Sequence, residues 1–169
     1  MLVVGCSSPE PINYETTLTE RDGVWYTKDT NKPYSGPVFS LFEDGKKKEE
    51  GTYKNGELNG LWTYWYESGK KYIEQNWDGG KKDGLETLWY ESGQKKFEGT
   101  YKDGKENGDQ TLWNESGQKT LEGTWKGGKE IVIKYTYYYG NGQKWKEGIW
   151  KDGEMIGFSE WDKSGNQLF

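Results

Sequence analysis

The sequence predicts an all-β protein, an elongated antiparallel meander of stacked β-hairpins with about twelve strands and no compact barrel. Two observations of composition and one of order support this prediction. The 169 residues include 25 Gly, 10 Trp, 13 Tyr and 5 Phe, but no Ala. A helical bundle is excluded because the best helix former is missing and each interior Gly costs a helix up to about 1 kcal/mol. A disordered chain is excluded because such chains are poor in aromatic residues.

The order of the residues adds an internal repeat of about 24 residues, which is the signature of a stacked array. We divide the chain into a tether at residues 1–22 and an array at residues 23–169. The repeat units are residues 23–50, 51–74, 75–98, 99–122, 123–147 and 148–169. The first and last units diverge from the others, as expected for copies that cap an array.

Each unit contains two segments with the alternation of a β-strand. In residues 95–102, Phe97, Gly99 and Tyr101 share one face, and the polar residues between them share the other. Residues 111–113 form the core of the second strand. Stacking these pairs of strands in sequence order produces the meander.

Glycine-containing turns separate the strands. Asp103-Gly104 begins a turn that we expect to close near Gly108, and Ser116-Gly117 predicts a tight turn. Asn141-Gly142 occupies the place of Ser116-Gly117 in the next unit. In that unit, residues 129–134 (KEIVIK) replace the turn glycine by a β-branched run, which predicts a local bulge or a contact point.

The period aligns the large side chains in columns. Cross-strand neighbours in such columns contribute roughly 0.2–1 kcal/mol per pair, so aromatic ladders can replace an aliphatic core. The first aromatic column contains Trp65, Trp89, Trp113, Tyr138 and Trp161. The second contains Tyr53, Trp77, Tyr101, Trp125 and Trp150, and a third column contains Ile73, Phe97 and Leu121.

The composition also limits the function. The chain has no His and one Cys, which removes the common zinc ligand sets and the His-dependent nucleophilic triads, so we expect no metal site, no cofactor and no catalytic residues. The net charge of −5 argues against a nucleic-acid surface. The repeated glutamates at 50, 74, 98, 122 and 147 lie beside lysines and predict a cross-strand charge ladder rather than an active-site pair.

The N-terminus resembles a bacterial lipobox. In Val3-Val4-Gly5-Cys6, a small residue precedes the cysteine that would be acylated, although only a short apolar segment lies upstream. The resemblance implies a lipid anchor at Cys6 as the one membrane contact and a place in the bacterial cell envelope. Ser7 after the cysteine implies the outer membrane in a Gram-negative cell. The alternative is a cytoplasmic protein.

The repeat itself resembles the bacterial variant of the MORN repeat (MORN_2), including YwqK-type antitoxin-like repeats. The resemblance is clearest at residues 51–56 (GTYKNG), 62–69 (WTYWYESG) and 94–99 (QKKFEG). It implies an elongated sheet of stacked hairpins and no shared catalytic residues. Bacterial proteins with such repeats include antitoxins and surface lipoproteins.

We therefore expect a non-catalytic scaffold or binding module that holds a protein partner on exposed aromatic residues. The expected surface consists of residues that stand beside the repeating columns, namely Trp62, Tyr64, Tyr66, Tyr135, Tyr137 and Tyr139. Each trio alternates, so its members point to one face, opposite Trp65 or Tyr138. Two alternatives stay open, a cell-wall or glycan-binding module and an antitoxin-like protein that neutralises a toxin.

Overall fold

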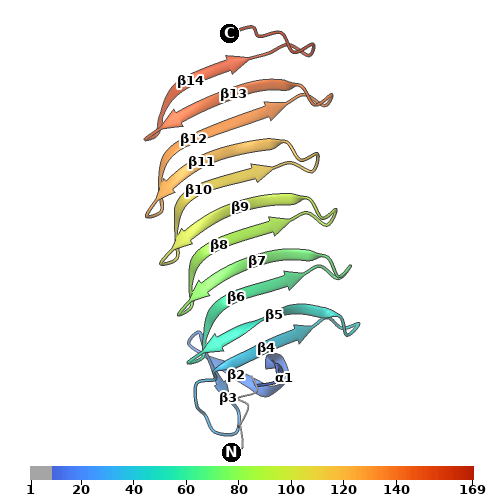
Figure 1. Cartoon of the computed structure of the whole chain (residues 1–169), viewed down its shortest axis with the longest axis vertical. Coiled ribbons are helices and arrows are strands. Elements are labelled where there is room, and N and C mark those ends of the chain that lie inside the picture. The colour runs from blue at the N-terminus through green and yellow to red at the C-terminus, as the bar shows by residue number, and fades with distance from the viewer. Residues whose placement is uncertain (1–8) are drawn as a thin grey trace, which may run out of the picture.

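The structure, a computed structural model, describes residues 9–169 and confirms the predicted all-β class. One long sheet forms the body, and a β-hairpin and a short helix lie at its N-terminal end (Figure 1). The elements are β1 (Ile12–Asn13), α1 (Tyr14–Thr17), β2 (Leu18–Arg21), β3 (Val24–Thr27), β4 (Gly36–Leu41), β5 (Lys47–Lys54), β6 (Glu57–Trp65), β7 (Lys71–Asp78), β8 (Lys81–Trp89), β9 (Lys95–Lys102), β10 (Lys105–Trp113), β11 (Lys119–Lys126), β12 (Lys129–Tyr138), β13 (Lys144–Lys151) and β14 (Glu154–Glu160).

The main sheet has twelve strands in the order β1-β4-β5 and then in sequence order to β14. Every pair from β4 to β14 is antiparallel, as the meander predicts. The exception is β1, which lies parallel to β4. Over residues 9–169 the sheet stays open, because β1 and β14 end the strand order instead of pairing with each other.

The turns on one edge of the sheet are shorter than we predicted. Asp103 and Gly104 both have positive φ, 50° and 81°, and Lys102 pairs directly with Lys105. This is the geometry of a two-residue hairpin, whose twist matches that of the strands. Gly108, with φ 110°, therefore does not close the turn; it lies inside β10, in a bulge of the ladder with β9.

The turns on the opposite edge follow the prediction. The tight turn at Ser116-Gly117 is confirmed, since Gly117 has φ 80° and donates its N–H to the Asn114 carbonyl at 2.9 Å. The same backbone hydrogen bond recurs where Gly142 donates to Tyr139. Stacked turns of one kind therefore line each edge.

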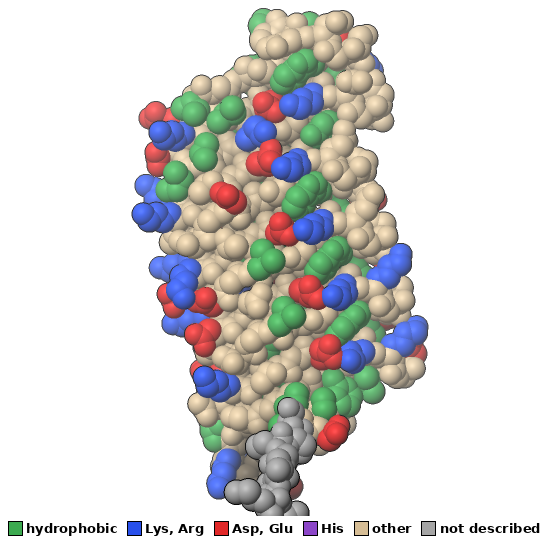
Figure 2. Space-filling view, viewed as in Figure 1, with side chains coloured by type: hydrophobic (Ala, Val, Ile, Leu, Met, Phe, Trp, Pro, Cys, Tyr) green, Lys and Arg blue, Asp and Glu red, His purple; other side chains and the backbone are tan. Residues whose placement is uncertain are grey.

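Each strand contributes side chains to two faces of this single sheet. We call one the ladder face, defined by Trp65, Lys71, Glu74 and their equivalents in other repeats. Lysine–glutamate pairs three residues apart recur along it, at 47/50, 71/74, 95/98, 119/122 and 144/147. Figure 2 shows red and blue pairs beside green side chains at the same place in successive repeats. The charges recur as predicted, but these five pairs lie within single strands rather than across strands; Lys134–Glu122 is a pair between neighbouring strands. Exposed pairs of this kind contribute little stability individually.

We call the other face the capped face, defined by Gly51, Tyr53, Trp62 and their equivalents. Glycines on this face let aromatic rings lie flat against the sheet. A Cβ on Gly51 would stand 2.2 Å from the Trp62 ring, and one on Gly148 would stand 2.3 Å from the Trp150 ring. The second and third columns lie on this face and the first on the ladder face, in line with the predicted alternation.

The N-terminal segment covers the first part of the capped face and corrects our description of a tether. We call β1, α1, β2 and β3 the cap. Tyr14 and Leu18 of the cap are buried with Val38, Tyr53 and Trp62 of the sheet. The boundary that we predicted at residue 22 falls inside the β2–β3 hairpin, and the first strand of the repeat array is β4.

The β-branched run at residues 129–134 lies in a strand, and the predicted local bulge is present. Thr124 pairs with Val132 and Trp125 with Glu130, which leaves Ile131 as the extra residue. Gly127 and Gly128 form the usual two-residue turn, and β12 continues as the longest strand, with 10 residues. In β10, Thr111 lies opposite both Glu98 and Glu122. In β12 no single residue lies opposite both neighbouring glutamates. Lys134 lies opposite Glu122, whereas Thr136 lies opposite Glu147. The pairing register therefore shifts by two residues across β12.

Candidate functional site

Trp62 of the N-terminal aromatic trio lies in the buried cluster that the cap helps to form, and Tyr64 packs against that cluster. Trp62 is 1% exposed and donates its Nε1–H to the Thr52 carbonyl at 3.1 Å. Tyr64 packs beside it, with ring centroids 6.2 Å apart, and is half-buried. Our expectation that Trp62 belongs to an exposed surface is wrong. The cause is the cap, whose contact with this face leaves no periodic signal in the sequence.

Tyr66 and Tyr139 have a structural role that the sequence analysis missed. The Tyr66 hydroxyl donates to the Trp89 carbonyl, and the Tyr139 hydroxyl donates to the Trp161 carbonyl, each at 2.8 Å. Tyr90 makes the same 2.8 Å bond to Trp113. Tyrosines just after β6, β8 and β12 thus link these strands to the repeat that follows. The 24-residue spacing of Tyr66 and Tyr90 could have revealed this link.

The C-terminal trio consists of Tyr135, Tyr137 and Tyr139 and includes an exposed ring, whereas Trp62 of the N-terminal trio is buried. Tyr135 and Tyr137 lie on the capped face of β12, opposite Gly148 and Lys146. Tyr137 is 53% exposed, and Tyr135 is half-buried against Trp150 with ring centroids 5.4 Å apart. Tyr137 is thus the sequence-predicted binding residue that the structure leaves exposed, and Tyr135 lies half-buried beside it.

Trp145 completes this surface, and the sequence analysis did not single it out. It lies at the bulge between Lys144 and Lys146 and is 39% exposed. Its ring centroid is 6.5 Å from that of Tyr137 and 6.1 Å from that of Tyr139, and the Lys146 ammonium lies 4.6 Å from it. We define the C-terminal aromatic cluster as Tyr135, Tyr137, Tyr139, Trp145 and Trp150.

A hollow of about 360 Å³ lies beside this cluster. Its lining includes Leu112, Leu121, Tyr135 and Tyr137 together with Asn114. Asn114 occupies the place that Tyr66 and Tyr90 fill in earlier repeats. Its amide bonds within its own turn, to Gln118 Oε1 at 3.1 Å, instead of reaching the next repeat. A departure from this pattern of tyrosines thus coincides with an apolar depression.

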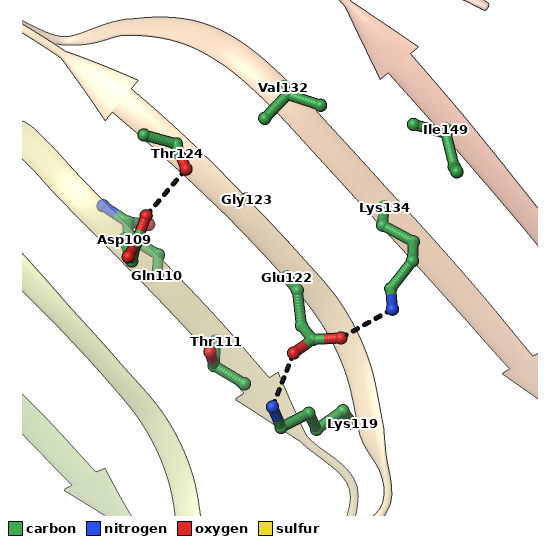
Figure 3. A pocket seen from close by; sticks show the side chains of 10 residues that line it. All are labelled: Asp109, Gln110, Thr111, Lys119, Glu122, Gly123, Thr124, Val132, Lys134 and Ile149. Carbon is green, nitrogen blue, oxygen red and sulfur yellow. Dashed lines mark hydrogen bonds and ion pairs between the residues drawn. The ribbon is translucent and has the colours of Figure 1, made fainter. Parts of the chain in front are cut away.

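A second hollow, of about 520 Å³, lies on the ladder face where β12 shifts register (Figure 3). Glu122 accepts hydrogen bonds from Lys119 at 2.5 Å and from Lys134 at 2.8 Å. The Lys119 bond, followed by the Lys134 bond, lowers the pKa of Glu122 below its ordinary value. Asp109 accepts a 2.7 Å bond from the Thr124 hydroxyl. The charges shown here thus satisfy one another, which does not favour a charged ligand.

The described residues contain no cluster of three or more His, Cys, Asp or Glu side chains that could hold a metal ion. None of the helices in residues 9–169 is long and apolar enough to cross a membrane. Cys6, the predicted lipidation site, lies outside the described residues.

A family model described as a MORN repeat variant matches residues 34–55, 58–78 and 82–103. The matched segments correspond to β4–β5, β6–β7 and β8–β9, so each contains two consecutive strands and the turn between them. They begin 24 residues apart, which confirms the predicted period at these three repeats. No curated protein matches the chain.

Proposed function

We propose that this chain is a non-catalytic binding module that holds a protein partner on the C-terminal aromatic cluster. The observation that carries the proposal is the difference between the two trios. The chain covers Trp62 with its own cap but leaves Tyr137 and Trp145 exposed on the same face. Exposed aromatic side chains that adjoin a hollow are typical of interaction sites.

The apolar hollow supports the same proposal. In the earlier repeats a tyrosine spans the space between neighbouring turns, but at Asn114 this side chain is short. The resulting depression adjoins Tyr137, so an apolar side chain of a partner can enter it beside the exposed ring. Burial of one large apolar side chain contributes about 1.5–3 kcal/mol to such an interface.

Site-specific photocrosslinking tests this proposal. A photoreactive phenylalanine analogue replaces Tyr137 in the intact chain and is irradiated in the native cell. We expect a discrete protein adduct that Trp145→Ser and Asn114→Tyr both abolish, because the first removes a ring of the cluster and the second fills the hollow. The matched control places the analogue at Tyr72, which is 38% exposed at a distant repeat. No adduct at 137, or the same adduct at 72, would contradict the proposal.

A glycan is the second candidate ligand, and the exposed ring of Trp145 beside Lys146 favours it. Aromatic rings stack on the apolar faces of sugars, and neighbouring polar groups bond their hydroxyls. A glycan array compares the wild-type chain with Trp145→Ser. Hits that disappear in the variant favour a glycan, whereas an empty array beside a positive control favours the protein partner.

For the place of action, the proposal is the bacterial cell envelope, with the chain anchored through acylated Cys6. Its support is the lipobox-like sequence at residues 3–6. Incorporation of labelled palmitate into the wild-type chain but not into Cys6→Ser is the expected result. No incorporation, with the chain in the cytoplasmic fraction, would instead favour the toxin-neutralising alternative.

A further inference from the structure

The middle tyrosine of each aromatic trio lies directly opposite a charged residue of a neighbouring strand. Tyr64 pairs with Glu49 across β5 and β6, and Tyr137 pairs with Lys146 across β12 and β13. In β8 and β10 the residue at this place is a leucine whose partners on both sides are apolar. The capped face thus carries a carboxylate beside one trio and an ammonium beside the other.

At the first trio, the charge binds the segment that lies over it. Glu49 is 9% exposed, and its carboxylate accepts hydrogen bonds from the Tyr14 hydroxyl of the cap and from Ser40 Oγ, the latter at 3.0 Å. Tyr14 and Leu18 of the cap are buried in the same cluster. A buried charge needs hydrogen bonds of this kind. Glu49 thus pairs the sheet with a segment that offers a hydrogen-bond donor near an apolar side chain.

At the second trio, the charge is accessible and weakly paired. The Lys146 side chain is 36% exposed, and the Glu160 carboxylate, at 3.9 Å, is beyond hydrogen-bond distance. By contrast, Lys144 of the same strand bonds Glu147 at 2.9 Å. The Lys146 ammonium lies 4.6 Å from the Trp145 ring centroid. The cluster therefore holds a positive charge beside its exposed rings, where a carboxylate of a partner can reach it.

Tyr137 lies between this charge and the apolar hollow of about 360 Å³. The hollow lies over β10 to β12, with Leu112 and Leu121 in its lining, whereas Lys146 is on β13. Neighbouring strands are about 4.8 Å apart, so the hollow and the ammonium are separated by roughly 10 Å. An extended segment spans this distance in about three residues.

We propose that Lys146 selects the partner of the C-terminal aromatic cluster, and that this partner is an acidic segment of another protein. The segment places an aspartate or glutamate on Lys146 and a large apolar side chain in the hollow, with the two about three residues apart. The sign follows from the comparison of the two trios, because Glu49 receives a hydrogen-bond donor whereas Lys146 requires an acceptor. Charge complementarity of this kind contributes more to specificity than to affinity.

This inference deepens the proposed function and rests on it, because it names the chemistry of the partner that the cluster holds. The two can fail separately. The proposed function requires the exposed rings, and the inference requires the charge of Lys146 in addition.

A random peptide library displayed on phage supplies the probe. The full chain is the bait, and peptides that also bind the Tyr137→Ser chain are discarded. We expect the retained peptides to carry aspartate or glutamate about three residues from a large apolar residue. One of them is synthesised with a fluorophore, and anisotropy measures its binding to the chain.

Charge variants of the chain then test the contact. Lys146→Glu should weaken binding about tenfold, Lys146→Gln should weaken it less, and Lys146→Arg should retain it. Lys146→Gln places no second carboxylate beside Glu160, so it answers the question even where Lys146→Glu folds poorly. The matched control is Lys144→Glu, since Lys144 is on the same strand with its side chain on the ladder face. A peptide with lysine in place of its acidic residue should bind Lys146→Glu better than the wild-type chain.

Equal binding of the peptide to wild type and Lys146→Gln, or retained peptides without an acidic residue, would overturn the inference but leave the proposed function standing, since these peptides still need Tyr137. An equal loss of binding in Lys144→Glu and Lys146→Glu would also overturn it, because net charge rather than a contact would then decide. If no peptide depends on Tyr137, both the inference and the proposed function are contradicted.

Discussion

The two ends of the capped face carry the same kind of aromatic trio in opposite environments. At the N-terminal end, the cap buries Trp62 together with Tyr14 and Leu18. At the C-terminal end, Tyr137 stands on a strand of the same sheet and is 53% exposed. The cap packs on the strand that carries the first trio, and β12 beneath the second trio also differs from β6 in its pairing register.

This comparison shows how a single sheet layer can carry both a core and a binding surface. Where the cap adds a second layer, aromatic rings pack on several sides, as Tyr53 does against Tyr14, Trp25 and Trp62. Beyond the cap, rings are covered only by neighbours on their own sheet. Each repeat there depends on its adjacent repeats for stability.

The largest difference between the two ends is expected for truncation of an aromatic ring. Trp62→Ala should lower the free energy of unfolding by about 3–5 kcal/mol, because it empties a fully enclosed site. Tyr137→Ala should change it by no more than about 0.5 kcal/mol, as for other exposed positions. Urea titration of both variants measures the difference. Equal losses would mean that the cap does not protect its end of the array.

Substitution of a glycine should give a smaller difference in stability between the two ends of the capped face. Gly51→Ala places a methyl group against Trp62, which is buried and held by its bond to Thr52, and should cost about 1–3 kcal/mol. Gly148→Ala meets the Trp150 ring at a similar distance, but this ring is half-buried and can move aside. A smaller loss of stability for Gly148→Ala, measured in urea, is the expected outcome. The reverse order would show that ring mobility does not decide the cost.

High pH should produce the smallest of these effects, a loss of folding stability at the end of the sheet that the cap covers. Burial, followed by the charge of Glu49, raises the pKa of Tyr64 to about 12, and burial is also the main cause of the raised pKa values of Tyr14 and Tyr53. Since these pKa values are higher in the folded chain than in the unfolded chain, their contribution is complete below about pH 10 and is lost as the pH rises further.

The urea midpoint of the chain should therefore fall between about pH 10 and about pH 12, and it should fall less in Tyr64→Phe, which has no phenol to ionise. The control is Tyr137→Phe, which should follow the wild-type curve because its ring lies outside the cap. An identical fall in Tyr64→Phe and wild type would show that buried phenols do not couple to unfolding.

Local patterns of the sequence predicted the repeating part of the fold. Alternation in residues 95–102 placed Phe97 and Tyr101 on one face, and Gly117 marked a turn. For Trp62, where the prediction went wrong, the deciding contacts were not local. Trp62 has the same alternation as Tyr137, but it is buried in one cluster with the distant Tyr14 and Leu18 as well as with Val38 and Tyr53. Asp103-Gly104 closes its turn at once because the bulge at Gly108 absorbs the residues that we had assigned to the turn.

The sequence by itself determined the all-β class, the period of 24 residues and the aromatic columns, since these follow from side-chain alternation within strands and from the stacking of similar repeats. Only the tertiary structure decided which aromatic residues are exposed. For Trp62 that depends on where a non-repeating segment folds back, which arises from contacts between residues that no period relates.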